Sequence, residues 1–299
     1  MSMTSGFSPS PGGTGSPSPE LVRALRRTAV ELASGAAELA LSGREKALSG
    51  EGVVDTKSTS TDVVTAMDRS CEDYLRAQIR KCRPQDAVLG EEAGVEGSFE
   101  GITWVVDPID GTVNYVYGRP AYAVSVAAVL GDPTVPGSWW PIAGAVCNPV
   151  TGETFHAGLG EGAAMDSPAG RRALRCTSVS EIGQTLLATG FGYAAERRRL
   201  QALALVEILP VVRDIRREGS AALDLCSVGS GLVDAYAEMG VNSWDIAAGW
   251  LVAQEAGAQV SFWSAGAGLP AGIAASPPAV AQEIHDLMTY AYTVAGQQL

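Results

Sequence analysis

The residues best suited to chemistry in this 299-residue chain are carboxylates that follow short apolar runs. The apolar run 104–106 predicts a buried strand that ends at the Asp-Pro pair after it, because proline cannot donate to a sheet ladder. Asp107 and Asp110 are three residues apart, so both could approach one cation. Gly111 and Thr112 follow them and offer small, accessible backbone amides to an anion. The stretch therefore predicts a combined metal and phosphate site.

Further acidic residues stand at other predicted strand ends or helix starts, and the whole set is Asp68, Glu91, Glu92, Asp107, Asp110 and Asp245. Any one of them alone is more often a turn residue, a helix cap or a solvated side chain. Together, without Cys or His nearby, they form a set of hard oxygen ligands that suits Mg²⁺ or Mn²⁺ rather than Zn²⁺.

The chain has little material for histidine chemistry. Its two histidines are His156, in a predicted hairpin, and His285, on the predicted terminal helix, and both are interpreted as surface or packing residues. A water molecule whose pKa is lowered by a bound cation is then the expected nucleophile.

Composition limits the classes of protein to which the chain could belong. A hydrophobic content of 46% and a charged content of 18% allow one large domain or two smaller ones. The net charge of −12 argues against broad binding to a nucleic-acid backbone, although metal ions could bridge the acidic protein to an anionic substrate. The five scattered cysteines predict neither a disulfide framework nor a zinc site and favour a reducing cytoplasm. No apolar run reaches the roughly 18 residues that span a bilayer, and a signal-peptide core is missing.

Apolar periodicity and turn residues predict the secondary structure of the chain. Residues 1–19, rich in Ser, Gly and Pro, are expected to be a disordered tail. Helices are predicted at 20–48, 69–82, 194–209, 221–229, 244–256 and 278–295, strands at 87–90, 121–130, 142–146, 153–157, 186–189, 259–262 and 273–275, and a loop at 158–170. Helices and strands alternate in blocks, which predicts a layered α+β architecture.

Four motifs carry a resemblance to a known family. They are Gly90-Glu91-Glu92, the stretch from Trp104 to Asn114 (WVVDPIDGTVN), the stretch from Gly219 to Leu225 (GSAALDL) and the stretch from Trp244 to Gly249 (WDIAAG). In this order they resemble the inositol monophosphatase family of Mg²⁺-dependent, lithium-sensitive phosphomonoesterases, over nearly all of the chain from the first helix onward. The second and fourth motifs are specific when they occur together.

The resemblance implies a fold and an assembly. It implies a layered αβαβα sandwich of the inositol monophosphatase and fructose-1,6-bisphosphatase type, and one catalytic domain over residues 20–299. The part up to about residue 185 would bind metal, and the part after it would bind substrate. A homodimer is also implied.

The resemblance further implies two or three Mg²⁺ ions, with Mn²⁺ as a possible substitute. Glu91, Asp107 and the carbonyl of Ile109 match the first metal site, Asp107, Asp110 and Asp245 match the second, and a third, weaker ion would again use Glu91. Asp68 and Thr112 match the pair that orients the attacking water, so that these two and Glu91 are the expected catalytic residues. Lys57 and Glu92 are expected near the site, outside the ligands themselves.

Substrate contacts are also carried over by position. The amides of Gly111 and Thr112 would hold the phosphate at the start of a short helix, ready for an in-line displacement. The backbone of Gly219, Ser220 and Ala221 and the carboxylates of Glu238 and Asp245 would meet the hydroxyls of the alcohol part, which disfavours analogues that lack them.

Two of these positions carry alternatives. Glu238 is the main expected specificity residue, although without the resemblance it would be interpreted as an exposed glutamate at a helix end. Glu218 departs from the apolar residue usual in the family, and its charge could reach the pocket or face solvent.

The expected activity is hydrolysis of myo-inositol monophosphate, with tolerance for other polyol phosphates. Histidinol-phosphate phosphatase, fructose-1,6-bisphosphatase and adenosine bisphosphate nucleotidase are the alternatives within the fold, and residues 219–222 and 235–240 are more similar to the inositol type. An alternative of another class is a binding factor of the transcription machinery. Its candidate contacts are Arg197, Arg198, Arg199, Arg213, Arg216 and Arg217, although such charge runs are usually solvated helix faces.

Overall fold

The computed structural model describes residues 17–48, 54–56, 63–264, 266 and 269–299, with side chains from 45 to 65 outside the description. The tail predicted at 1–19 lies outside the described residues apart from 17–19, where the first helix already begins at Pro19. Lys57 also lies outside them. Among the described residues, the longest helices are either too short or too polar to cross a membrane.

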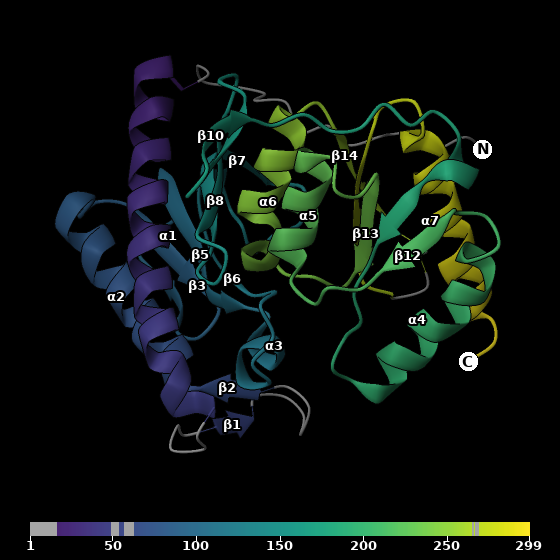
Figure 1. Ribbon diagram of the computed structural model, residues 1–299, viewed down its shortest axis with the longest axis horizontal. Helices are drawn as coiled ribbons and strands as arrows, with labels where there is room; N and C mark the ends of the chain where they lie inside the picture. Colours follow the sequence, from purple (N-terminus) through teal and green to yellow (C-terminus); the bar gives the residue numbers. More distant parts are fainter. Residues whose placement is uncertain (1–16, 49–53, 57–62, 265, 267–268) are drawn as a thin grey trace.

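An eight-stranded sheet forms the first half of the molecule (Figure 1). Its order is β10-β9-β8-β7-β6-β5-β3-β4, and only the β3–β5 pair is parallel. The strands are β3 (Ala87–Gly90), β4 (Gly94–Glu96), β5 (Ile102–Asp110), β6 (Ala123–Gly131), β7 (Trp139–Asn148), β8 (Glu153–Gly158), β9 (Ala163–Ser167) and β10 (Gly170–Ala173). Helices α1 (Pro19–Leu48) and α2 (Ala66–Cys82) cover its outer face. A small ribbon of β1 (Val54–Thr56) and β2 (Val63–Thr65) joins these two helices.

A five-stranded sheet forms the second half. Its order is β12-β11-β13-β15-β14, from β11 (Leu186–Ala188), β12 (Asp214–Arg216), β13 (Ala235–Met239), β14 (Gln259–Trp263) and β15 (Gly272–Ser276). Helices α4 (Ala195–Ile208) and α7 (Ala281–Gly296) cover its outer face, while α5 (Ala221–Ser230) and α6 (Ser243–Glu255) lie between the two sheets (Figure 1). Two short helices, α3 (Thr112–Val116) and the 3-10 turn η1 (Ile182–Gln184), complete the chain. The predicted αβαβα sandwich is confirmed.

Helix α6 is the centre of the core. Every residue from Ile246 to Ala253 is buried, because sheets cover this helix on two sides and α5 packs against it. Glycines allow α6 to approach α5 and β7 closely. A Cβ on Gly249 of α6 would lie 2.7 Å from the Leu225 Cβ of α5, and a Cβ on Gly144 of β7 would lie 3.0 Å from the Ala248 Cα of α6. The middle of α6 is therefore enclosed by the core, and Asp245 lies in the first turn of this helix.

Strand β5 does not end where the sequence predicts. It continues through Asp107 and Pro108 to Asp110, and its register with β6 shifts between the pair Asp107–Ser125 and the pair Asp110–Ala123. One extra residue therefore stands on β5, and a bulge of this kind tolerates a proline because the ladder is already interrupted there. The bulge bends the strand at the point where its two carboxylates enter the site.

Other differences concern short or polar elements. The loop predicted at 158–170 contains β9, and the short strands β4, β10 and β12 were not predicted. These three are edge strands or lie next to an edge, and most of their residues are half-buried or exposed. They consequently lack the apolar alternation from which a strand is recognised. Helix α2 begins at Ala66, three residues before its predicted start, so that Asp68 lies in its first turn.

Candidate active site

A cavity of about 300 Å³ lies where the two halves of the molecule meet. Its wall includes eleven residues selected from the sequence, namely Glu91, Asp107, Ile109, Asp110, Gly111, Thr112, Gly219, Ser220, Ala221, Glu238 and Asp245. Asp68 and Glu92 do not line it. Residues separated by more than 150 positions thus meet at the ends of β3, β5 and β13 and at the starts of α3, α5 and α6.

The bulge in β5 fixes the first group of oxygen atoms. The Asp107 side chain is 1% exposed, and its Oδ1 accepts a hydrogen bond from the Ile109 amide at 3.0 Å. The Thr112 hydroxyl lies 3.1 Å from both the Ile109 carbonyl and Asp68 Oδ1. Asp68 is fully buried next to Thr112 and does not itself line the cavity. Asp68 and Thr112 are therefore in contact, and their role in orienting a water molecule stays a prediction.

Asp110 links the two halves of the molecule. Its Oδ2 accepts hydrogen bonds from the Ser220 hydroxyl at 2.6 Å and from the Ala222 amide at 2.7 Å. Ser220 is also the N-cap of α5, and its hydroxyl oxygen accepts from the Leu223 amide at 3.3 Å. A carboxylate at a helix N-terminus is stabilised by the unpaired amides and by the helix dipole. This contact sets the position of α5 relative to the β5 bulge.

Gly111 explains why the chain can turn from β5 into α3. It has a φ of 95°, and a Cβ there would lie 3.0 Å from the carbonyl oxygens of Ala121 and Gly219. A side chain at this position would be strained by the positive φ and would crowd the backbone of both neighbours. Asn114 in α3 strengthens the same junction by donating from Nδ2 to the carbonyls of Ala121 and Glu218 at 2.6 and 2.8 Å.

Asp245 is held by the start of α6. Its Oδ2 accepts from the Asn242 amide at 2.6 Å, which is one half of a capping box. Burial raises the pKa of Asp245 well above its ordinary value, and the nearby charges of Glu91 and Asp110 raise it further. Burial likewise raises the pKa of Asp110 to about 6, against the lowering effect of its hydrogen bonds.

The donor set fits a hard divalent cation. The carboxylates repel each other in a buried site, and a cation between them would relieve that repulsion. Within the described part of the chain, no three Asp, Glu, His or Cys side chains already stand in a closed ligand arrangement. The oxygens therefore share one cavity without being gathered around one point.

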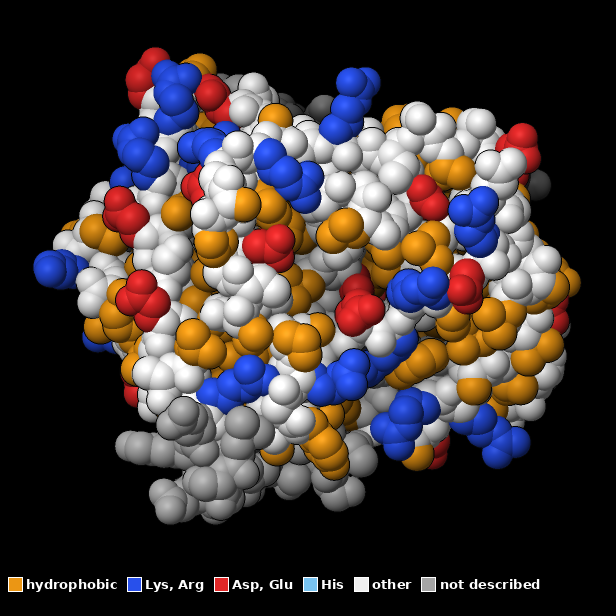
Figure 2. All heavy atoms as spheres, viewed as in Figure 1, with side chains coloured by type: hydrophobic (Ala, Val, Ile, Leu, Met, Phe, Trp, Pro, Cys, Tyr) orange, Lys and Arg blue, Asp and Glu red, His pale blue; other side chains and the backbone are white. Residues whose placement is uncertain are grey.

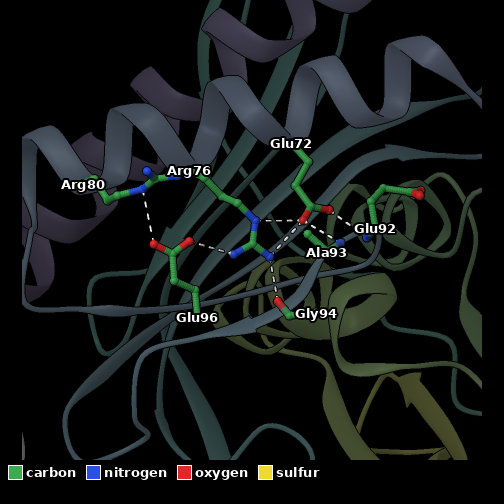
Figure 3. A network of polar contacts seen from close by, with 7 residues as sticks. All are labelled: Glu72, Arg76, Arg80, Glu92, Ala93, Gly94 and Glu96. Atoms are coloured by element: carbon green, nitrogen blue, oxygen red, sulfur yellow. Dashed lines mark hydrogen bonds and ion pairs between the residues drawn. The ribbon is translucent and has the colours of Figure 1, made fainter.

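A buried ion pair holds the turn that follows Glu91 (Figure 3). Glu72 of α2, 1% exposed, accepts hydrogen bonds from the amides of Glu92 and Ala93 at 2.8 and 3.0 Å. The same carboxylate accepts from Arg76 Nε at 2.8 Å. Gly90 permits this approach, since a Cβ there would lie 2.3 Å from Glu72 Oε1. The turn that follows β3 is thus tied to α2 on the side away from the cavity.

Glu238 lines the same cavity from β13 and is not a glutamate at a helix end. It is half-buried on β13, where the Tyr236 hydroxyl donates to its Oε2 at 2.9 Å. Its carboxylate lies against Gly190, whose Cβ would be 2.0 Å from Oε2. Burial raises the pKa of Glu238 to about 7. The position selected for specificity therefore faces the cavity.

Several residues of this wall were not predicted from the sequence. Arg197 and Arg217 line the cavity, together with Phe191 and the buried Asp224. Both arginines are among the candidate contacts of the alternative function, a binding factor of the transcription machinery. Arg217 stands two positions before Gly219, and this closeness to a motif was the available signal. Glu218 is exposed and does not line the cavity, although its carbonyl binds Asn114.

Neither histidine belongs to the site. His156 is 3% exposed on β8, with its Nδ1 2.8 Å from Arg26 Nε and its Nε2 3.2 Å from Asp166 Oδ2. Burial, followed by the charge of Arg26, lowers its pKa to about 4. His285 is half-buried on α7. Both are packing residues in the structure.

Fold and site together are those of a phosphatase with an acidic, metal-type active centre. The family described as the inositol monophosphatase family matches residues 21–293, and the chain belongs to this family. Families of this kind depend on a metal ion, typically Mg²⁺.

Named relatives agree with this assignment. The chain is 47% identical over 243 residues to the inositol-1-monophosphatase SuhB of Mycobacterium tuberculosis, which covers 79% of this chain and 81% of the relative. It is 36% identical over 218 residues to a protein of Escherichia coli named Nus factor SuhB, at coverages of 72% and 78%. The solved structure of Mycobacterium tuberculosis SuhB matches with a TM-score of 0.75 and 42% identity, over 90% of this chain and 97% of that one. The IMPase of Thermotoga maritima matches with a TM-score of 0.75 at 26% identity, over 90% and 98%.

Proposed function

We propose that this protein hydrolyses myo-inositol monophosphate, and other polyol phosphates more slowly, with Mg²⁺ bound by Glu91, Asp107, Asp110, Asp245 and the Ile109 carbonyl. One observation carries the proposal. Oxygen ligands for a hard cation, backbone amides for a phosphate and a carboxylate for hydroxyls follow one another along the wall of a single cavity. The relatives named inositol-1-monophosphatase support the choice of substrate.

Different residues of the chain have different roles in the proposed reaction. When bound, Mg²⁺ neutralises charge on the phosphoryl group and lowers the pKa of a coordinated water. Thr112 lines the cavity, and its hydroxyl is held by the buried Asp68. The amides of Gly111 and Thr112 hold the phosphate in line with the attacking water.

The C-terminal part selects the alcohol. Glu238 is oriented by Tyr236 and can accept hydrogen bonds from vicinal hydroxyls. A deoxy analogue would leave this carboxylate without a partner, and such a loss discriminates strongly between substrates. We further propose a division at about residue 185 between metal-binding and substrate-binding parts, a homodimer in the cytoplasm, and inhibition by lithium.

The test is phosphate release from a panel of substrates in the presence of Mg²⁺. Turnover of myo-inositol monophosphate should exceed that of histidinol phosphate, fructose 1,6-bisphosphate and adenosine bisphosphate, and chelation of the metal should remove it. Turnover of myo-inositol monophosphate far below that of histidinol phosphate or either bisphosphate would refute the substrate assignment.

A second candidate function is binding to the transcription machinery, because several relatives are named Nus factor SuhB. An Asp110→Asn variant separates the two functions. Loss of phosphatase activity with retention of the cellular role would favour the binding function, and joint loss would favour the enzyme.

A further inference from the structure

One aromatic side chain lines the cavity without belonging to the core of the molecule. Phe191 is half-buried and forms part of the cavity wall in the segment just before α4. Among the described residues, it packs against none of the four apolar clusters of the core and stacks on no other aromatic ring. Core packing therefore does not explain a phenylalanine at this position.

Arg217 approaches this ring without covering it. Its guanidinium carbon lies 6.0 Å from the centre of the Phe191 ring, which is the outer limit of a cation–π contact. Carbon atoms in van der Waals contact lie about 3.5–4 Å apart. Arg217 is therefore too far away to be stacked on the ring.

The loop that carries Phe191 is fixed by one buried glutamine. Gln201 of α4 is 1% exposed, and its Oε1 accepts a hydrogen bond from the Gly192 amide at 2.9 Å. Its Nε2 donates to the Gly190 carbonyl at 3.4 Å. A single side chain thus holds the residues on both sides of Phe191. The backbone of the loop is in place before a substrate binds, which lowers the cost of ordering it on binding.

The two glycines let this loop lie directly against charged side chains of the wall. A Cβ on Gly190 would collide with the Glu238 carboxylate, and a Cβ on Gly192 would collide with the Arg197 side chain. On the face shown in Figure 2, hydrophobic side chains lie among Lys and Arg side chains in the region of α4. Phe191 is thus one residue away from a direct contact with Glu238, the proposed acceptor for hydroxyls. An aromatic side chain and a hydroxyl acceptor are neighbours in the wall.

A cyclic polyol offers a matching surface for each of them. In a chair-shaped ring with mostly equatorial hydroxyls, the hydroxyls lie around the rim and the axial C–H groups form two apolar faces. The hydrogens of these C–H groups are weakly positive, and the face of an aromatic ring carries the negative part of its quadrupole. An open-chain polyol has hydroxyls but no fixed C–H face.

We propose that Phe191 is a specificity-determining residue, whose ring packs on the C–H face of a cyclic alcohol part, and that Gln201 positions it. The inference rests on the proposed phosphatase function and adds to it the residue by which phosphates of cyclic polyols are preferred to those of open-chain polyols. The reaction at the phosphate is unchanged, because neither residue belongs to the proposed metal ligands or phosphate amides.

The experiment compares a cyclic and an open-chain substrate, myo-inositol 1-phosphate and glycerol 2-phosphate, in the Mg²⁺-loaded protein. Phe191→Leu keeps an apolar side chain and removes the aromatic face. It should lower kcat/KM for myo-inositol 1-phosphate by about 3- to 10-fold, the range of an aromatic contact, and leave kcat/KM for glycerol 2-phosphate unchanged. Phe191→Tyr keeps the ring and should resemble wild type with both substrates. Tyr117→Leu is the matched control, because Tyr117 is 78% exposed and does not line the cavity.

Gln201→Met tests the positioning role. Loss of both contacts with the loop should raise KM for myo-inositol 1-phosphate and leave its kcat, and both constants for glycerol 2-phosphate, as in wild type. A general loss of structure would lower activity on both substrates instead. When Gln201→Met is added to Phe191→Leu, no further loss is expected, since Gln201 acts through Phe191. Additive losses would show that Gln201 does not act through this ring.

A binding measurement does not depend on turnover. In saturation-transfer NMR, saturation of the aromatic protons of the protein should reach the C–H protons of myo-inositol, and the transfer should weaken in Phe191→Leu but not in Tyr117→Leu. Equal losses for the two substrates in Phe191→Leu, no loss for the cyclic one, or unchanged saturation transfer would each overturn the role of Phe191. A wild-type protein that hydrolyses no phosphomonoester refutes the proposed function instead, and saturation transfer to myo-inositol then still tests Phe191.

Discussion

Asp107 shows how a single residue serves both the fold and the proposed chemistry. Its carboxylate is almost fully buried at the bulge of β5, where one oxygen accepts a hydrogen bond from the Ile109 amide. Buried carboxylates in a common cavity repel one another, so the protein keeps this group at a cost in stability. Such a cost is expected where a residue is retained for function.

Replacement of Asp107 by asparagine separates the two contributions. Asparagine keeps the oxygen that accepts from Ile109 and removes the negative charge. We expect kcat/KM to fall by at least about 100-fold, because the charge stabilisation that a metal supplies is worth several kcal/mol. The free energy of unfolding without metal should stay level or rise. Phosphate release and chemical denaturation measure both quantities, and a variant that retains activity would contradict the metal role of Asp107.

His156 predicts a pH dependence of stability. Its pKa in the folded protein is lowered to about 4, so between pH 6.5 and 4 the unfolded chain takes up a proton that the folded protein does not. Stability from this group is therefore fully present above pH 6.5 and is lost as the pH falls toward 4, by roughly 3 kcal/mol at most.

The measurement is the difference between wild type and His156→Gln in free energy of unfolding from pH 7 to pH 4. Glutamine can keep contacts with Arg26 and Asp166, and all the carboxylates titrate in both proteins. The difference should shrink or reverse as the pH falls. Parallel curves would show that His156 becomes protonated in the folded protein as readily as in the unfolded one.

At the scale of elements, the sequence predicts those strands and turns that an apolar run or a motif marks directly. Strand β3 was predicted at its observed bounds, and the acidic turn after it follows from the end of that run. The continuation of β5 was not predictable, because a bulge depends on pairing with β6. Arg197 and Arg217 were missed for a related reason: their place in the wall depends on contacts with Gly240 and Phe191, from other parts of the chain.

Helix α2 acts on the site through the Glu72–Arg76 pair. Glu72→Gln should raise the Mg²⁺ concentration needed for half-maximal activity several-fold, because the turn carrying Glu91 loses its anchor. Stability should fall by about 3 kcal/mol, since a buried pair would be broken. Mg²⁺ titration of activity and thermal unfolding measure the two effects.

The control for this prediction is Glu96→Gln. Glu96 also pairs with Arg76, at 3.2 Å, but its side chain is 46% exposed and it does not bind the turn. Its replacement should cost less than about 1 kcal/mol and leave the Mg²⁺ requirement unchanged. If Glu72→Gln lowered stability and left the Mg²⁺ requirement as in wild type, the pair would be structural only.

At the scale of the whole molecule, the two sheets share one layer of helices. The apolar cluster between them combines Val146 and Phe155 of the first sheet with Leu225, Tyr236 and Trp250 of the second half. A division of the chain at about residue 185 would expose this layer on both sides. The proposed division at residue 185 therefore separates metal-binding from substrate-binding residues. It does not separate two folding units, and we expect the two sheets to unfold in one transition.

Gly249→Ala tests this coupling, since its Cβ would lie 2.7 Å from the Leu225 Cβ in the shared layer. Overpacking there should lower the free energy of unfolding by about 1–3 kcal/mol. Far-UV circular dichroism and tryptophan fluorescence should give one coincident transition in wild type and one earlier, coincident transition in the variant, because both halves contain buried tryptophans such as Trp104 and Trp263. Gly101→Ala, where a Cβ would meet nothing within 4 Å, is the control and should not move the midpoint. Two separate transitions would mean that each half folds on its own and that the cavity between them is assembled afterwards.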